Sequence, residues 1–215
     1  MSRNREWLIP LTGVAFVLVG IVGFAIGGEP KSADDPVKEI VDFYVDNKDS
    51  VQISAVLGVV AGLLLIFFGA YLRKVLRAAA PDEDILPLVA FIGFVVVAVS
   101  FAVDGTIALA LAETADDIDP VGVQALQALW DNDFLPLVLG VECFLWGTGL
   151  CALRTGALPK WLGWVMIVLA VLGLTPVGFV AAIGAALLVL VLSIMLALRA
   201  RSATPAVPST PPAMR

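Results

Sequence analysis

Residues 51–77 read VQISAVLGVVAGLLLIFFGAYLRKVLR, and this stretch decides the fold of the chain. Its first part, residues 51–72, is predominantly apolar, whereas its end carries Arg73, Lys74 and Arg77. A helix of about 20 apolar residues crosses the ~30 Å hydrocarbon core of a bilayer. Lys and Arg gather on the cytoplasmic side of membrane proteins. The stretch therefore predicts a transmembrane helix that ends on the cytoplasmic side.

Similar runs recur along the whole chain, at about residues 7–27, 51–72, 85–112, 134–153, 158–175 and 177–198. Hydrophobic residues make up 60% of the sequence and charged residues only 15%, compared with about 25% charged residues in a soluble domain. This pattern predicts an all-α integral membrane protein, a six-helix bundle within residues 1–201. The Pro-, Ser- and Thr-rich residues 202–215 predict a disordered cytoplasmic tail.

The hydrophilic gaps between these runs alternate in charge. Two long gaps are acidic, residues 73–77 and 154–160 and both chain ends carry Arg or Lys, and the short break at Thr175-Pro176 has no charge. The basic set comprises Arg3, Arg5, Arg73, Lys74, Arg77, Arg154, Lys160, Arg199, Arg201 and Arg215. Because Lys and Arg resist translocation, the pattern predicts six crossings with both termini cytoplasmic (N-in/C-in) in a cell membrane.

Each long acidic gap also has the pattern of a short amphipathic helix. Asp35-Pro36 and Asp119-Pro120 are typical helix starts, with Asp as the N-cap and Pro as the first helical residue. Apolar residues then recur at helical spacing: Val37, Ile40, Val41 and Tyr44 in the first gap, and Val123, Leu126 and Trp130 in the second. We expect two short helices on the outer face of the bundle.

Two ionisable residues, Asp104 and Glu142, lie inside apolar runs. Charges in the hydrocarbon region are costly and usually face the bundle interior or a watery cavity. Each acid lies nine residues from the acidic end of its run, so the two carboxyls are expected at a similar depth. Ser100 and Trp146, one turn away from them, are expected on the same faces. The four residues form a candidate intramembrane ion or proton site.

A structural interpretation stands beside this functional one. Residues 85–103 alone are long enough to cross the membrane, which would leave Asp104 at the outer interface. Glu142 would then be a protonated acid that hydrogen-bonds a neighbouring helix and serves only the fold.

Other residue patterns have simpler interpretations. Lys160, Trp161 and Trp164 suit an anchor at the cytoplasmic interface, where Trp is enriched. Small-residue spacings such as Gly58 and Gly62 allow close helix contact, either within the bundle or between copies of the chain.

The sequence also excludes several kinds of chemistry. It contains no histidine, which excludes His-metal and bis-His haem sites and histidine acid–base catalysis. It has no P-loop and no Gly-x-Ser-x-Gly motif. We therefore expect no catalytic residues, no metal and no cofactor. The expected partners are membrane lipids and either a second copy of the chain or another membrane protein, but not nucleic acid.

Three segments resemble an uncharacterised family of multi-pass membrane proteins from high-GC bacteria. They are ALRTGALPKWLGW (residues 152–164), VDFYVDNKD (41–49) and AYLRKVLR (70–77). The resemblance implies a bacterial inner-membrane protein that contains a domain of unknown function. It supplies no catalytic residues.

Together these observations favour a non-enzymatic membrane protein that acts as a scaffold, a sensor or a binder of a hydrophobic ligand or partner. The alternative is a small proton- or cation-coupled transporter that uses Asp104 and Glu142. A cavity that joins both carboxyls to the outside would favour the transporter.

Overall fold

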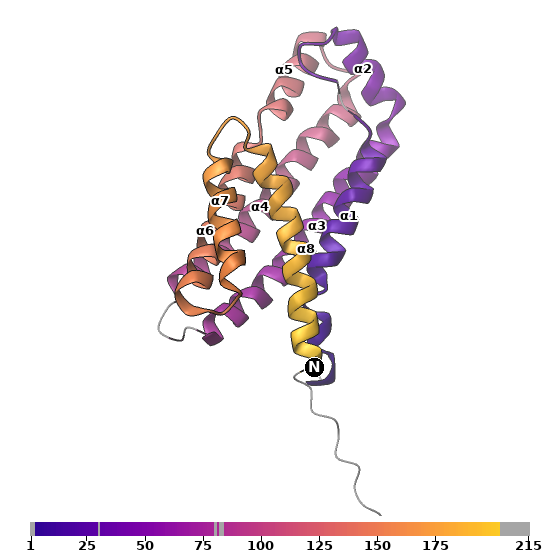
Figure 1. The fold of residues 1–215 in the computed structure, drawn as a ribbon. Helices are drawn as coiled ribbons and strands as arrows, with labels where there is room; N and C mark the ends of the chain where they lie inside the picture. Colours follow the sequence, from indigo (N-terminus) through magenta and orange to yellow (C-terminus); the bar gives the residue numbers. More distant parts are fainter. Residues whose placement is uncertain (1–2, 30, 80, 82–83, 203–215) are drawn as a thin grey trace, which may run out of the picture.

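The computed structural model describes residues 3–29, 31–79, 81 and 84–202, and these form an all-helical bundle (Figure 1). The elements in chain order are η1 (Arg3–Leu8), α1 (Thr12–Gly27), α2 (Val37–Asp46), α3 (Lys48–Ala79), α4 (Ile85–Thr114), α5 (Pro120–Asp131), α6 (Leu135–Thr155), α7 (Lys160–Gly173) and α8 (Phe179–Ser202). The all-α prediction is confirmed. The predicted tail, apart from Ser202 at the end of α8, lies outside the described residues.

Five helical segments of the described chain are long and apolar enough to cross a membrane. They are Glu6–Gly27, Lys48–Ala79, Ile85–Thr114, Pro120–Thr155 and Phe179–Ser202. The remaining apolar helix, α7, has 14 residues and is therefore about 21 Å long. The described chain thus has five helices compatible with a membrane bundle, and α7 is shorter than a typical hydrocarbon core.

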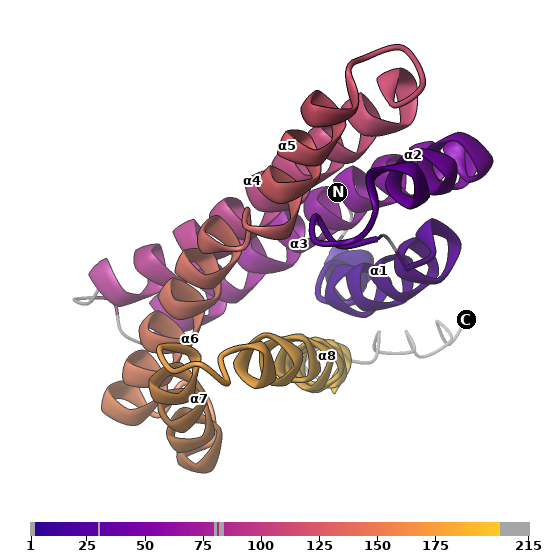
Figure 2. The same ribbon diagram turned by 90° about the horizontal axis from the view of Figure 1, so that it is seen from above.

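Helices α3 and α4 form the central pair of the bundle. Helix α1 packs on α3, α6 packs on α4, and α7 joins α6 to α8, which returns to α1 (Figure 2). Small residues permit these close approaches. A β-carbon added to Gly62 would lie 3.1 Å from Ala98 Cβ, and one added to Gly23 would lie 3.3 Å from Leu57 Cβ. These glycines therefore serve helix contacts within the bundle.

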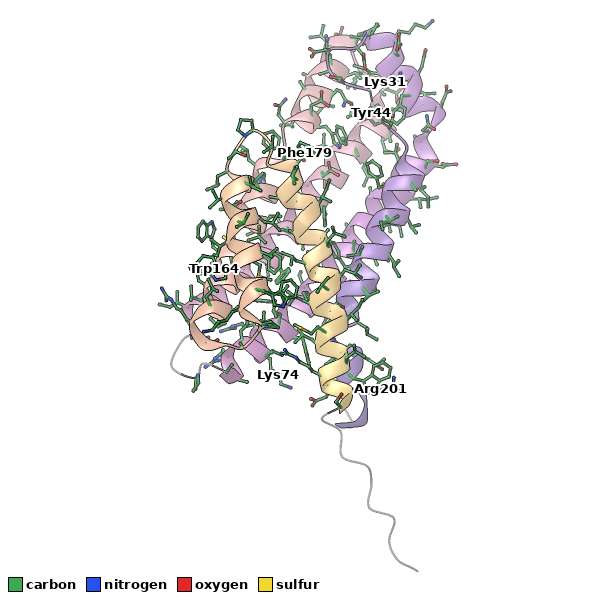
Figure 3. All side chains as sticks on the ribbon, viewed as in Figure 1. Lys31, Tyr44, Lys74, Trp164, Phe179 and Arg201 are labelled. Carbon is green, nitrogen blue, oxygen red and sulfur yellow. The ribbon has the colours of Figure 1, made fainter. Side chains whose placement is uncertain are left out.

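The two ends of the bundle differ in charge. Lys74 and Arg201 lie at one end, and Lys31 and Tyr44 lie at the other (Figure 3). At the end we call the basic end, Arg73 and Arg77 each reach Asp84 at 3.2 Å and link α3 to the start of α4. Both η1 and the last turn of α8 lie at this end (Figure 1). The acidic residues of the two long gaps lie around α2 and α5, at the acidic end.

Helices α2 and α5 pack together over the acidic end, and we call them the outer cap. Ile40 and Tyr44 of α2 and Val123 and Gln127 of α5 are buried at a spacing of four residues, as one face of a helix requires. Ile40, Tyr44 and Val123 join Val51, Leu111, Ala112 and Ala115 in a small apolar core of their own. The two predicted amphipathic helices are therefore present, and their apolar faces bury each other.

The start of α5 agrees with its sequence signal, but the start of α2 does not. The Asp119 carboxylate accepts a hydrogen bond from the Val121 backbone N–H at 2.9 Å, with Pro120 at the first helical position. In α2, Pro36 is itself the N-cap, because its backbone angles (φ −55°, ψ 129°) are not helical. Asp35 therefore precedes the cap, and its carboxylate accepts from the Ser32 N–H instead.

Helices α1 and α8 are joined near the basic end by one buried side chain. The Ser193 hydroxyl donates to the Pro10 carbonyl and accepts from the Val14 N–H at 3.0 Å. This satisfies backbone groups at the first turn of α1, where a helix leaves them without partners. Toward the acidic end the two helices part, and the space between them becomes the candidate site.

Candidate functional site

Asp104 lies on α4 between two cavities. One is apolar and lies among α1, α3, α4 and α8, whereas the other is acidic and lies under the outer cap. Asp104, Phe101 and Trp130 line both of them. These three residues therefore form a shared wall between the two spaces.

The apolar cavity has a volume of about 620 Å³, within the range of about 300–1,000 Å³ that is typical of small-molecule sites. Its polar side chains are Tyr44, Ser54, Asp104 and Trp130, and its other lining residues are apolar or glycine. Ile21, Phe24 and Ile183 both line the cavity and are more than half exposed. The cavity therefore opens sideways, between α1 and α8, onto the apolar surface of the bundle.

Small side chains leave this space open. Gly20 of α1 faces the cavity, and a β-carbon added there would meet nothing within 4 Å. Ala55 of α3 and Ala182 and Ala186 of α8 line the same space. The cavity thus results from the divergence of α1 and α8 combined with small residues on the surfaces that face it.

The acidic pocket has a volume of about 540 Å³. It is lined by Ser32, Ser100, Phe101, Asp104, Trp130, Asp131, Asp133, Phe134 and Leu137. Ser100 is buried one turn before Asp104 and lines the same pocket, on the face that the sequence predicted. No group of three acidic or Cys side chains among the described residues is placed to hold a metal ion. The acids that line the pocket are Asp104, Asp131 and Asp133.

Trp130 connects the outer cap to this wall. Its indole N–H is buried and makes no hydrogen bond of ordinary geometry to a described residue. The indole still interacts electrostatically with the Asp104 carboxyl, although it does not meet the geometry of a hydrogen bond. The oxygens of Asp104 therefore keep most of their capacity to accept hydrogen bonds from a ligand.

A chain of hydrogen bonds holds the cap above the cavity. The buried Tyr44 hydroxyl donates to Gln127 Oε1 at 2.9 Å, and Gln127 Nε2 donates to Asp131 Oδ1 at 2.8 Å. Asp131 Oδ2 accepts from the Ala33 N–H at 2.8 Å, which fixes the segment before α2. Burial raises the pKa of the Tyr44 phenol well above its usual value, and the nearby carboxylates of Asp131 and Asp104 add to this shift. Tyr44 is therefore a neutral donor.

Glu142 lies elsewhere, among α6, α7 and α8. Its side chain is 7% exposed, and neither carboxyl oxygen has a hydrogen-bond partner among the described residues. Oε1 occupies the place that a β-carbon on Gly173, the last residue of α7, would need. Trp146, one turn further along α6, is half-buried and approaches the same carboxyl. Glu142 lines neither the apolar cavity nor the acidic pocket.

The expectation that Asp104 and Glu142 meet at one depth is therefore corrected. Gly93 of α4 packs against Gly140 and Phe144 of α6, so Glu142 lies level with Gly93. Asp104 follows Gly93 by eleven residues, which is about 16 Å along the helix axis. The close approach of glycines sets this register, and distance from the ends of the apolar runs does not predict it.

The three expected interfacial anchors lie at the start of α7. Lys160 is its first residue, and Trp161 and Trp164 are about 60% exposed. Trp164 points away from the bundle (Figure 3). The indole rings therefore face the surroundings of the bundle and not its interior.

The sequence did not single out several residues of the site, namely Gly20, Tyr44, Trp130, Asp131 and Asp133. The sequence places Trp130 and Tyr44 only on the apolar faces of the two short helices. One signal was available for α5, because the amide of Gln127 falls on the same face as Val123. A polar residue on such a face indicates a buried hydrogen bond.

Compared with protein-family models, with curated proteins and with solved structures, the chain matches none of them.

Proposed function

We propose that this protein binds a hydrophobic ligand from the membrane in the apolar cavity, without catalysing a reaction. The observation that carries the proposal is the sideways opening between α1 and α8, which Ile21, Phe24 and Ile183 line. A ligand dissolved among the lipid chains enters such an opening without crossing water. Binding of this kind suits a sensor or a scaffold that responds to the ligand.

The proposal includes a topology. The chain crosses a bacterial inner membrane six times, with both termini and the basic end in the cytoplasm. The positions of Lys74 and Arg201 opposite Lys31 support it (Figure 3), and the resemblance to multi-pass proteins of high-GC bacteria agrees with it. Asp104 follows the first residue of α4 by 19 residues, or about 28 Å. With a ~30 Å core, this depth brings Asp104 near the outer interface.

Transport by a pair of acids receives no support from the cavities. The transporter needs Asp104 and Glu142 in one space that reaches the outside. Of these two acids, only Asp104 lines the apolar cavity and the acidic pocket, whereas Glu142 is enclosed against Gly173. The binding proposal needs only the residues that the structure brings together.

The test fills the cavity without disturbing helix contacts. In Gly20→Phe, the new side chain enters open space. The matched control is Leu18→Phe on the same helix, because Leu18 is 59% exposed and does not line the cavity. Each purified protein is placed in lipid nanodiscs, and its thermal unfolding midpoint is measured while dodecanol is added.

Dodecanol should raise the midpoint of the wild type and of Leu18→Phe but not that of Gly20→Phe. At a concentration 100 times the dissociation constant, a ligand stabilises the folded state by about 2.7 kcal/mol. Each kcal/mol corresponds to about 2–4 °C in a protein of this size. An equal shift in all three proteins would mean that dodecanol acts through the bilayer, and no shift in the wild type would mean that the cavity does not bind it. Either result rejects the proposal.

A further inference from the structure

We infer that the ligand is a single-chain amphiphile with a primary ammonium head. The head lies at the wall formed by Phe101, Asp104 and Trp130, and the apolar chain lies in the cavity and leaves between α1 and α8. This inference rests on the proposed function, because it names the ligand class of the same cavity.

Charge is the first reason. Asp104, Asp131 and Asp133 all line the acidic pocket behind the wall. Among the described residues, no Lys or Arg forms an ion pair with any of the three. The lysines of the acidic end that form ion pairs do so elsewhere: Lys31 with Glu39 at 3.6 Å and Lys48 with Glu113 at 3.2 Å. A cationic head complements this site, whereas a carboxylate or phosphate head would face three acids.

The free acceptor atoms are the second reason. Both oxygens of Asp131 already accept hydrogen bonds from protein groups. Asp133 Oδ2 is buried without a hydrogen-bond partner among the described residues, and the indole of Trp130 is the one donor that interacts with Asp104 among them. A buried acceptor without a donor is costly. A primary ammonium brings three N–H donors, whereas a trimethylammonium brings none.

The aromatic rings are the third reason. Phe101 and Trp130 line the space on both sides of the Asp104 carboxyl. The face of an aromatic ring attracts a cation within about 6 Å, and Trp does so most strongly. The wall therefore combines a carboxylate with two aromatic side chains at the boundary of an apolar cavity.

The depth of Asp104 in the cavity fits an amphiphile. Gly105 packs on Ala55 and Gly62 packs on Ala98, so Asp104 lies level with the middle of the α3 segment that lines the cavity. That segment runs from Val51 to Ala61, about 15 Å along the axis. A head at Asp104 has apolar lining below it for the first part of a chain, and the side opening releases the rest into lipid.

The experiment compares four probes of equal chain length: dodecylammonium, dodecyltrimethylammonium, dodecanol and dodecanoate. Binding is measured at pH 7 from the rise in the unfolding midpoint of the full chain in nanodiscs of uncharged lipid. For the wild type, dodecylammonium should bind at least about tenfold more tightly than dodecanol, and dodecanoate should bind most weakly. Dodecyltrimethylammonium should fall between dodecylammonium and dodecanol.

Variants then assign the head to its site. Asp104→Asn should remove the advantage of dodecylammonium and leave dodecanol affinity within about twofold, since the chain contacts remain. Asp104→Glu should retain part of the advantage. Asp133→Asn should narrow the difference between the primary and trimethylated heads. Asp117→Asn is the control, because Asp117 is an exposed acid of the same end that lines neither space.

The outcomes separate this inference from the proposed function. If dodecanol binds the wild type as tightly as dodecylammonium, the inferred ammonium head group is wrong, but the cavity still binds hydrocarbon chains. If Asp104→Asn and Asp117→Asn weaken dodecylammonium binding equally, surface charge attracts the probe and the assigned head site is rejected. If no probe stabilises the wild type, the binding function itself fails. Unfolding midpoints without ligand show whether Asp104→Asn folds. If it does not, Asp104→Glu and Asp133→Asn test whether the ammonium head binds at this wall.

Discussion

Gly93→Ala should weaken the contact between α4 and α6, although alanine is the better helix former. A β-carbon at Gly93 would lie 2.5 Å from both the Gly140 carbonyl oxygen and the Phe144 backbone nitrogen. Ordinary contact begins at 3.4 Å, so the overlap is about 0.9 Å. Because both opposing atoms belong to the backbone, no side chain can rotate away. The two helices must separate.

The magnitude follows from two opposing effects. Overpacking a close contact costs about 1–3 kcal/mol, whereas replacing Gly by Ala inside a helix gains up to about 1 kcal/mol. Gly20→Ala isolates the second effect, since its new methyl group meets nothing within 4 Å. The difference in unfolding free energy between the two variants should therefore be about 1–3 kcal/mol, with Gly93→Ala the less stable.

Both variants are unfolded reversibly in mixed micelles by adding a denaturing detergent, and their unfolding free energies are compared with that of the wild type. If Gly93→Ala and Gly20→Ala agree within about 0.5 kcal/mol, a spread common for surface substitutions, then α4 and α6 do not approach as described. That result would also contradict the register of α4 on α6 that separates Asp104 from Glu142.

Three further predictions concern the contact of Glu142 with Gly173, the buried Tyr44 hydroxyl and the topology. Gly173→Ala should destabilise the fold because its methyl group takes the place of Glu142 Oε1. The loss of unfolding free energy should be smaller when Glu142→Ala is also present. Additive losses in a double-mutant cycle would contradict this contact. The raised pKa of Tyr44 favours its neutral form in the folded protein, so stability should fall as pH rises above about 10. Tyr44→Phe should lower stability at neutral pH by about 1–3 kcal/mol. In a pH series of unfolding midpoints, it should also reduce the loss of stability above about pH 10. An unchanged loss would refute its assignment to Tyr44. Impermeant thiol reagents should label Asp117→Cys in intact cells and Arg77→Cys only after permeabilisation, and labelling of both in intact cells would reject the topology.

The helices could be predicted from the sequence, and so could part of the site. Apolar runs, charged gaps and the Asp119-Pro120 start are local signals, and the structure has helices at those places. Asp104 was identified because a charge inside an apolar run is costly wherever the helix packs. Ser100 followed from helical spacing alone. Each of these inferences depends on residues within one element.

The features that could not be predicted from the sequence depend on contacts between distant elements. The pairing of Asp104 with Glu142 required the register of α4 on α6, and Gly93 and Gly140 set that register through backbone atoms. The apolar cavity required the divergence of α1 and α8 from their junction at Ser193. Glycines that look alike in sequence have opposite roles here: Gly93 brings two helices together, whereas Gly20 leaves a space empty.

The shortness of α7 has a consequence for the surrounding bilayer. At about 21 Å, α7 is some 9 Å shorter than an average hydrocarbon core, while α3 has 32 residues on the other side of the molecule. Hydrophobic mismatch costs a fraction of a kcal/mol per Å. In the proposed six-span topology, α7 therefore requires the bilayer beside it to become thinner or the molecule to tilt toward that flank. We expect such a protein to favour thinner regions of membrane.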